Sequence, residues 1–247
     1  MVKHLHEQER QKRMSELLQG HPWKKQRILK KEYIPDISQM IDMIDEFDYL
    51  YEQALFVLAY QTAGRISELI KTPFLKKAKY KTETYEKEFG MYETRIVRNV
   101  NGTPIQESTE KIRIDYPGIL AKDLSFTQRG GKDILIVRMA NRKNKNFKKK
   151  NIPIPINKEP EMVEVIKSYV EGMKKDTPLF PFQRWTAEKI LAKVNMNPHF
   201  LRDIRLTHMV TVYGYNTHQL VKFAGWQNIS PAERYVRLGV DDLVVNF

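Results

Sequence analysis

The sequence of 247 residues contains no cysteine and no long apolar run. The absence of cysteine excludes disulfides, thiolate metal sites and thiol redox chemistry, and is typical of a reducing compartment. The longest purely apolar or aromatic run, Ala54 to Tyr60, is far too short for a membrane-spanning helix, and the charged amino terminus lacks the apolar segment of a secretion signal. We therefore expect an intracellular protein without a membrane partner.

The chain carries an excess of basic residues, 42 Lys and Arg against 30 Asp and Glu, for a net charge of +12. Such an excess favours a polyanionic partner, with nucleic acid as the leading candidate. Residues 1–33 form a predicted basic amino-terminal arm in which Lys24, Lys25 and Arg27 are candidate contacts to a DNA backbone. A solvated tail explains the same charges equally well.

A sequence near the first third of the chain, Thr62-Ala63-Gly64-Arg65-Ile66-Ser67-Glu68-Leu69, places an arginine just after a glycine. Asp48 is a candidate cap for the preceding helix, Gly64 is expected to end it, and Arg65 is expected in the first turn of the next. Backbone amides at that position favour a bound anion. Glu68 lies three residues on and can support Arg65, although an ordinary helical ion pair gives the same spacing.

The middle of the chain predicts two β-hairpins. Strand-like segments flank Asn101-Gly102 within residues 74–117, which we interpret as an insertion. A second pair of strands, Ile134 to Met139 and Ile152 to Ile154, flanks a basic connection. The basic residues of that connection are candidate DNA contacts: Arg142, Lys143, Lys145, Lys148, Lys149 and Lys150.

The last fifty residues contain His199-Phe200-Leu201-Arg202, Gly225-Trp226 and Tyr235, with apolar spacing that predicts two helices broken at Gly214. Arginine offers a permanently charged, planar fork of donors that fits phosphate oxygens, and tyrosine is an oxygen nucleophile. Because only about one tyrosine in a thousand is ionised at neutral pH, Tyr235 needs positive surroundings or a base. His199 can bind a nonbridging oxygen or help to take the tyrosine proton.

In order and spacing, these motifs resemble the tyrosine recombinase (phage integrase) family, and the last segment is similar to archaeal members. The resemblance runs from about Asp48 to the end, and Trp226 stands nine positions before Tyr235 (235 minus 226), as in the family. It implies an α+β fold, a mainly α-helical catalytic domain with a small antiparallel β-sheet, over residues 34–247. The catalytic residues that it implies are Arg65, Lys143, His199, Arg202, Trp226 and Tyr235, with Glu68 in support and Lys145 as the alternative lysine.

The same resemblance implies a site-specific recombinase or integrase that cuts and rejoins double-stranded DNA through a 3′-phosphotyrosyl bond, as a tetramer of identical chains on DNA. Neither a cofactor nor a metal is expected, and the histidines lack the i, i+4 spacing of a helical zinc pair. Two alternatives stay open. One is a DNA relaxer similar to type IB topoisomerases, and the other is a non-catalytic DNA-binding protein with the same scaffold.

Overall fold

A computed structural model describes residues 34–78, 83–87, 91–95, 110–140 and 149–245 of the chain. Within these residues the helices are α2 (Ile37–Asp42), α3 (Leu50–Thr62), α4 (Ile66–Leu69), α5 (Pro160–Val170), α6 (Arg184–Ala192), α7 (Pro198–Thr211), α8 (Thr217–Ala224) and α9 (Ser230–Val245). Short 3-10 helices lie at Met43–Glu46, Ala121–Asp123 and Ile156–Lys158. The predicted α+β class, mainly helical with a small antiparallel sheet, is confirmed.

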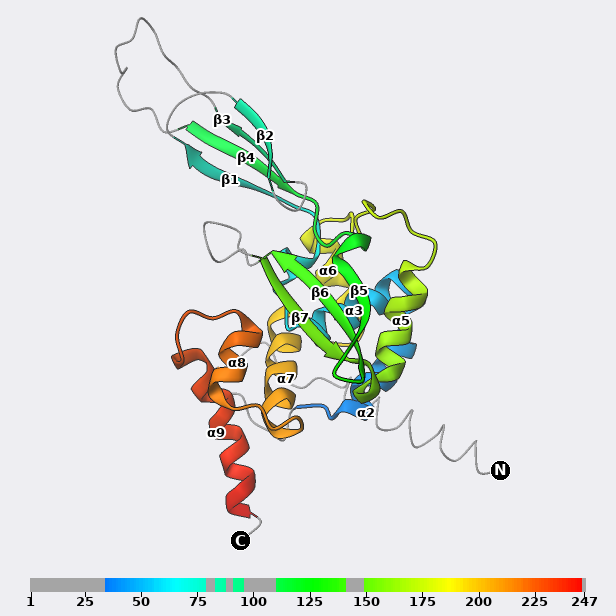
Figure 1. The fold of residues 1–247 in the computed structure, drawn as a ribbon, viewed down its shortest axis with the longest axis vertical. Helices are drawn as coiled ribbons and strands as arrows, with labels where there is room; N and C mark the ends of the chain where they lie inside the picture. Colours follow the sequence, from blue (N-terminus) through cyan, green and yellow to red (C-terminus); the bar gives the residue numbers. More distant parts are fainter. Residues whose placement is uncertain (1–33, 79–82, 88–90, 96–109, 141–148, 246–247) are drawn as a thin grey trace, which may run out of the picture.

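Two antiparallel sheets accompany the helices. Strands β1 (Thr72–Ala78), β2 (Glu83–Lys87), β3 (Met91–Arg95) and β4 (Glu110–Tyr116) form one sheet in the order β1-β4-β3-β2, and β5 (Leu124–Arg129), β6 (Lys132–Ala140) and β7 (Lys149–Pro155) form the other in chain order. The four-stranded sheet extends away from the helices, whereas the three-stranded sheet lies against them (Figure 1). Residues 74–117, predicted as an insertion, thus contribute most of the extended sheet.

The predicted hairpin of residues 134–154 is confirmed as β6 and β7, which pair with Val137 opposite Ile152 and Leu135 opposite Ile154. All four of these side chains are buried, because alternate residues of a strand face the same side of a sheet. The tip of the hairpin, including Lys143 and Lys145, lies outside the described residues.

Helix α3 lies at the centre of the core, where it packs against α5, α6, α7 and β7. Its residues from Ala54 to Thr62 are all buried, which explains why the longest apolar run of the sequence shows so little amphipathic pattern. Asp48 does not cap this helix as predicted; Tyr49 occupies the cap position, and the Asp48 carboxylate instead pairs with Lys193 at 3.1 Å.

A buried polar network links α3, α5 and α7. The Arg205 guanidinium donates to the Glu159 carboxylate, and Gln61 Nε2 donates to the other Glu159 oxygen at 3.1 Å. Beside this pair, Tyr60 and His208 form a hydrogen bond of 2.7 Å between the hydroxyl and Nδ1. Because each of these groups is buried with a partner, the network fixes how the three helices meet.

The described residues include no helix long and apolar enough to cross a membrane. They also include no cluster of three or more histidine, aspartate or glutamate side chains arranged to hold a metal ion. Trp185 is 56% exposed, and the Lys189 ammonium lies 4.6 Å from the centroid of its ring.

Candidate active site

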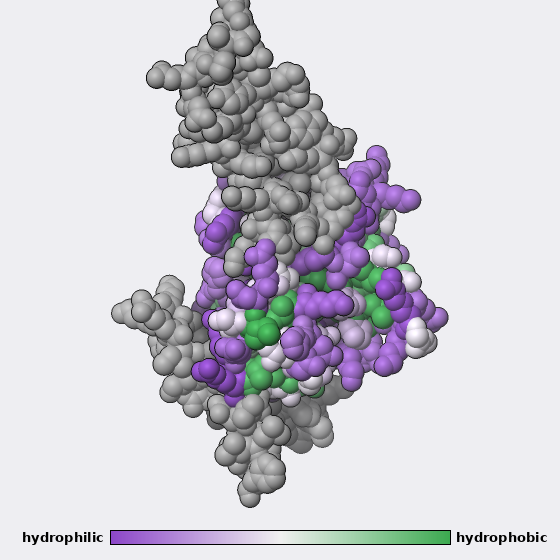
Figure 2. Space-filling view, turned by 60° about the vertical axis from the view of Figure 1, so that its left-hand side comes forward, coloured by the Kyte–Doolittle hydropathy of each residue, from purple (hydrophilic) through white to green (hydrophobic). Residues whose placement is uncertain are grey.

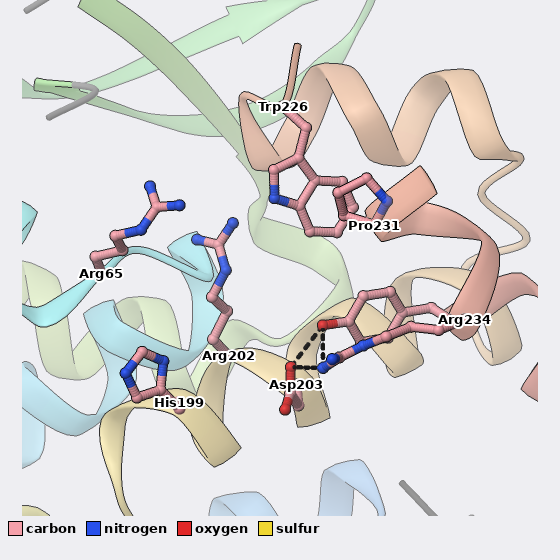
Figure 3. Close-up of a pocket in the computed structure, with 8 residues that line it drawn as sticks. Arg65, His199, Arg202, Asp203, Trp226, Pro231 and Arg234 are labelled. Atoms are coloured by element: carbon pink, nitrogen blue, oxygen red, sulfur yellow. Dashed lines mark hydrogen bonds and ion pairs between the residues drawn. The ribbon is translucent and has the colours of Figure 1, made fainter. Parts of the chain in front are cut away.

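One pocket of about 380 Å³ gathers five of the six residues that the sequence predicts as catalytic. Figure 3 shows Arg65, Arg202 and His199 on one side of this pocket, with Trp226 above and Asp203 and Arg234 on the opposite side. The residues that line it are Arg65, His199, Arg202, Asp203, Trp226, Pro231, Arg234 and Tyr235.

Arg65 reaches the pocket because the end of α3 turns sharply. Ala63, and not Gly64 as predicted, carries the left-handed backbone conformation that ends the helix, with φ 44° and ψ 32°. Gly64 has a different role: a Cβ at this position would lie 2.8 Å from Met139 Cε and 2.9 Å from Thr62 Oγ1. The turn therefore depends on a residue without a side chain between α3 and β6.

Arg65 itself is the N-cap of α4, so it precedes the first helical turn in which it was predicted. Its backbone N–H donates to Glu68 Oε2 at 3.1 Å, and its guanidinium lies 3.3 Å from Glu68 Oε1. The amide that was expected to meet an external anion is thus bound by the chain's own carboxylate. The side chain of Arg65 remains 31% exposed and faces the pocket.

Glu68 is fully buried, and cations surround it. Lys150 Nζ lies 3.3 Å from Glu68 Oε2, so that Arg65 and Lys150 pair with the two oxygens of one carboxylate. Burial alone would raise the pKa of Glu68, but Lys150, Arg65 and Arg202 hold it below its ordinary value. Glu68 is consequently an ionised group that organises the surrounding positive charge.

Lys150 was predicted only as one of several DNA contacts, yet it enters the buried side of this cluster from the start of β7. Burial is the main cause that lowers the pKa of its ammonium, and nearby Arg202 and Arg65 lower it further against the opposing effect of Glu68. Among the described residues no well-aligned hydrogen bond satisfies Lys150 Nζ, so its contact with Glu68 is an ion pair.

Arg202 reaches the pocket from α7. Asn197 caps this helix by accepting hydrogen bonds from the backbone N–H groups of His199 and Phe200 at 3.1 and 2.9 Å, and Pro198 occupies its first turn. The Arg202 guanidinium donates to the carbonyl oxygens of Ala63 and Ala224, the latter at 3.4 Å. Arg202 is 7% exposed, so these carbonyls fix its orientation toward the pocket.

Trp226 is positioned by the glycine before it. Gly225 ends α8 in a left-handed conformation with φ 70°, and the Trp226 backbone N–H returns to the Val221 carbonyl at 3.0 Å. The indole ring then stacks on Tyr235 with a centroid distance of 5.9 Å and an interplanar angle of 15°. The Arg202 guanidinium also contacts the indole ring, and its Cζ lies 5.7 Å from the Trp226 ring centroid.

Tyr235, on α9, is 3% exposed, and its hydroxyl meets two charged groups. The hydroxyl donates to Asp203 Oδ1 at 2.5 Å and accepts from the Arg234 guanidinium at 2.8 Å. Arg234 also pairs with Asp203 at 2.5 Å, which closes a triangle of contacts marked by the dashed lines in Figure 3. Neither Asp203 nor Arg234 was singled out in the sequence.

Tyr235 needs positive surroundings or a base to ionise, and in the structure the positive surroundings are not sufficient. Burial is the largest effect and raises the pKa of Tyr235 well above its ordinary value, and Asp203 raises it further. Arg234 and Arg202 act in the opposite direction without reversing the shift. The tyrosine is therefore neutral in this arrangement and must lose a proton before it can act as a nucleophile.

The other predicted site residues have different positions. His199 is exposed and lines the pocket, and among the described residues no hydrogen bond joins its ring to Tyr235. The side chain of Lys149 is not described, and Lys24, Lys25, Arg27, Arg142, Lys143, Lys145 and Lys148 lie outside the described residues.

Comparison with known proteins gives a distant likeness among solved structures. No family model and no curated protein matches the sequence. Among solved structures, the chain is similar to the XerH site-specific recombinase bound to its difH substrate in a pre-cleavage complex, with a TM-score of 0.45 and 11% identity. The match covers 88% of this chain and 52% of that one, so this chain spans about half the length of XerH. At such low similarity, the assignment of function depends on the residues of the pocket.

Proposed function

We propose that this chain cuts and rejoins DNA as a tyrosine-type site-specific recombinase, through a covalent bond between Tyr235 and a 3′-phosphate. The observation that carries the proposal is a pocket in which cations outnumber carboxylates and which holds a tyrosine hydroxyl. Among the described residues, the four cations Arg65, Lys150, Arg202 and Arg234 lie around two carboxylates, Glu68 and Asp203, and four minus two leaves two positive charges. A phosphodiester entering the pocket would supply one of the two missing negative charges.

The transition state of phosphoryl transfer places negative charge on the nonbridging oxygens, and donors fixed in advance stabilise that charge most effectively. Arg65 and Arg202 are the proposed donors. Glu68 anchors Arg65 from its buried side, and the carbonyls of Ala63 and Ala224 anchor Arg202. Each guanidinium is therefore held in place before substrate arrives.

The remaining roles follow from chemistry and exposure. His199 is accessible from the pocket and can donate a hydrogen bond to a nonbridging oxygen. The Trp226 indole N–H can donate a hydrogen bond that positions the phosphate, but it transfers no proton. The leaving 5′ oxygen needs a proton, and Lys143, with Lys145 as the alternative, stays the predicted donor. We assign Lys150 a different role, in which its buried ammonium holds Glu68 and thereby Arg65.

The proposed partner is double-stranded DNA, and the proposed active assembly is a tetramer of this chain on DNA within the cell. Figure 2 shows the face that lies to the left in Figure 1, and its described surface is largely hydrophilic with small, separate hydrophobic areas. Polar surface of this kind suits contacts with a sugar-phosphate backbone. The chemistry itself requires no nucleotide or metal, because the phosphotyrosyl bond conserves the energy of the cleaved linkage.

The test uses nicked duplexes, because a strand end cleaved beside a nick diffuses away and the covalent complex accumulates. The sequence around the nick is randomised. Wild-type protein is expected to give a complex that resists denaturation, whereas Tyr235→Phe, which keeps the ring and its stacking on Trp226, is expected to give none. Identical behaviour of the two proteins would overturn catalysis and favour a DNA-binding protein. Two-duplex substrates then separate strand exchange from simple relaxation.

A further inference from the structure

We propose that Asp203 is the catalytic base that takes the proton of Tyr235 during strand cleavage. This inference deepens the proposed function and rests on it. It begins from the contact between Asp203 Oδ1 and the Tyr235 hydroxyl, which at 2.5 Å is the closest polar contact that this hydroxyl makes among the described residues. A base must lie within hydrogen-bond reach of the proton that it removes, and Asp203 fulfils this condition before substrate binds.

The position of Asp203 in the fold ties it to the phosphate-binding arginine. Asp203 follows Arg202 directly on α7, so the same helix that orients the proposed phosphate donor also presents the carboxylate to α9. The Asp203 carboxylate is 24% exposed and belongs to the lining of the pocket, which gives the pair access to the reacting centre. Tyrosine, phosphate donor and base thereby meet on adjacent surfaces of two packed helices.

The surroundings of the tyrosine create the need for a base. Tyr235 is buried against Trp226 and next to a negative charge, so spontaneous ionisation is less favourable than for a tyrosine in water. The other candidate base, His199, makes no described hydrogen bond to the hydroxyl. Arg234 donates to both Asp203 and the hydroxyl, and it can therefore hold the two groups together and stabilise the oxygen as the proton leaves.

The step balances as follows. The Tyr235 oxygen forms its bond to phosphorus while the bond from phosphorus to the 5′ oxygen breaks, and the tyrosine proton moves to Asp203 Oδ1. The leaving 5′ oxygen receives a proton from the general acid, the role predicted for Lys143. In the rejoining reaction a 5′-hydroxyl attacks the phosphorus of the phosphotyrosyl linkage and gives its proton back to the general acid. The bond from phosphorus to the tyrosine oxygen breaks, and Asp203 returns its proton to that oxygen.

The pH dependence of this step involves every charged or titratable group of the pocket. Besides Asp203 and Tyr235, these are Arg65, His199, Arg202 and Arg234, with Glu68 and Lys150 on the buried side of Arg65. Because arginine stays charged at any working pH, the guanidinium groups of the pocket do not contribute to this pH dependence. A His199→Gln variant separates the contribution of the histidine from that of the pair.

The experiment compares wild type, Asp203→Asn and, as a matched control, Asp176→Asn, which neutralises an exposed aspartate paired with Lys122 outside the pocket. Single-turnover formation of the covalent complex is followed from pH 6 to 9 on a duplex selected from the randomised pool. We expect Asp203→Asn to be slower by about 100-fold or more at pH 7, because general base catalysis contributes at least that factor. Asp176→Asn should match wild type.

Replacement of Tyr235 by a fluorinated tyrosine, whose hydroxyl is more acidic, provides the readout that a structural role would not change. This replacement should accelerate Asp203→Asn more than wild type, because a more acidic nucleophile depends less on a base. Circular dichroism and DNA affinity of the variants check that the fold and the binding site are intact.

The outcomes separate the two proposals. If wild type forms no covalent complex, the proposed function fails, and the base has no reaction to serve. If wild type forms the covalent complex and Asp203→Asn reacts as fast or faster, the proposed function stands and Asp203 is not the base. A faster variant would show that the Asp203 carboxylate slows the attack of the Tyr235 hydroxyl. Equal responses to the fluorinated tyrosine in both proteins would also refute the base.

Discussion

Substitution of Glu68 by glutamine tests whether one buried carboxylate organises the cationic pocket. Glutamine keeps the shape of the side chain but removes the charge that faces Arg65 and Lys150 at 3.3 Å each. Removal of one partner from a buried ion pair costs about 3–5 kcal/mol, because the other charge stays buried without compensation. The fully buried position of Glu68 places it in this class.

Lys150 sets an upper limit to the effect. An unpaired ammonium can lose its proton instead of staying charged. Because pH 7 lies about 3.4 units below the ordinary pKa of lysine, and each unit costs about 1.4 kcal/mol, this deprotonation costs about 5 kcal/mol in total. In Glu68→Gln the pKa of Lys150 is lowered further, so the folded state binds fewer protons than the unfolded state above that pKa. Stability should therefore rise with pH on the acidic side of the ordinary pKa of lysine, and more steeply than in wild type.

Urea unfolding followed by circular dichroism measures both effects, with a constant m-value as the condition for comparison. The double variant Glu68→Gln/Lys150→Met should be less destabilised than the sum of its parts by at least about 1 kcal/mol, since it leaves no lysine charge unpaired. Glu188→Gln, which breaks the partly exposed pair with Arg184, is the matched control and should change stability by less than about 1 kcal/mol. A loss below about 1 kcal/mol in Glu68→Gln, together with additivity in the double variant, would refute this account of the pocket.

Three further predictions concern single residues. The pKa of buried His208 is lowered to about 4, mainly by burial and then by Arg205. The free energy of unfolding should therefore fall by up to about 3 kcal/mol as the pH decreases from 6.5 toward 4. His208→Leu should flatten this part of the stability profile measured by urea unfolding. Gly64→Ala should displace Thr62 or Met139 and reduce covalent complex formation more than DNA affinity, and equal loss of both would contradict this role. Arg202→Ala should lose about 3 kcal/mol or more of transition-state stabilisation, more than 100-fold in rate, with most DNA affinity retained in anisotropy titrations; unchanged cleavage at saturating DNA would exclude Arg202 from the reaction.

The sequence predicts much of the fold because several of its signals are local. Alternating apolar residues and a basic connection predict the β6–β7 hairpin, and the glycine at 214 correctly separates α7 from α8. The end of α3 is harder to predict, because the left-handed conformation belongs to Ala63 although a glycine stands next to it. Tertiary packing decides this detail. Gly64 is needed where the backbone closely approaches Met139, and the left-handed conformation lies at the preceding residue, Ala63.

The site was predictable only where a motif marks it. Arg65, Arg202, Trp226 and Tyr235 line one pocket although they come from four separate segments, and their residue types and order signalled this arrangement. Lys150 was predicted only as one of several DNA contacts, because a sequence does not show which lysine of a strand end turns inward.

Asp203 and Arg234 gave no signal at all. An aspartate after Arg202 and an arginine before Tyr235 acquire meaning only when α7 packs against α9 and brings them to the tyrosine hydroxyl. Contacts of this kind depend on helix packing and therefore appear only in the folded structure.

The most direct test of the central claim is to locate the atom that becomes joined to DNA. Covalent complexes trapped on nicked duplexes are digested with protease and nuclease, and the nucleotide-bearing peptide is sequenced by mass spectrometry. The account predicts a nucleotide 3′-phosphate on the hydroxyl of Tyr235. A nucleotide on any other residue, or no adduct from a protein that binds the same DNA, would contradict it.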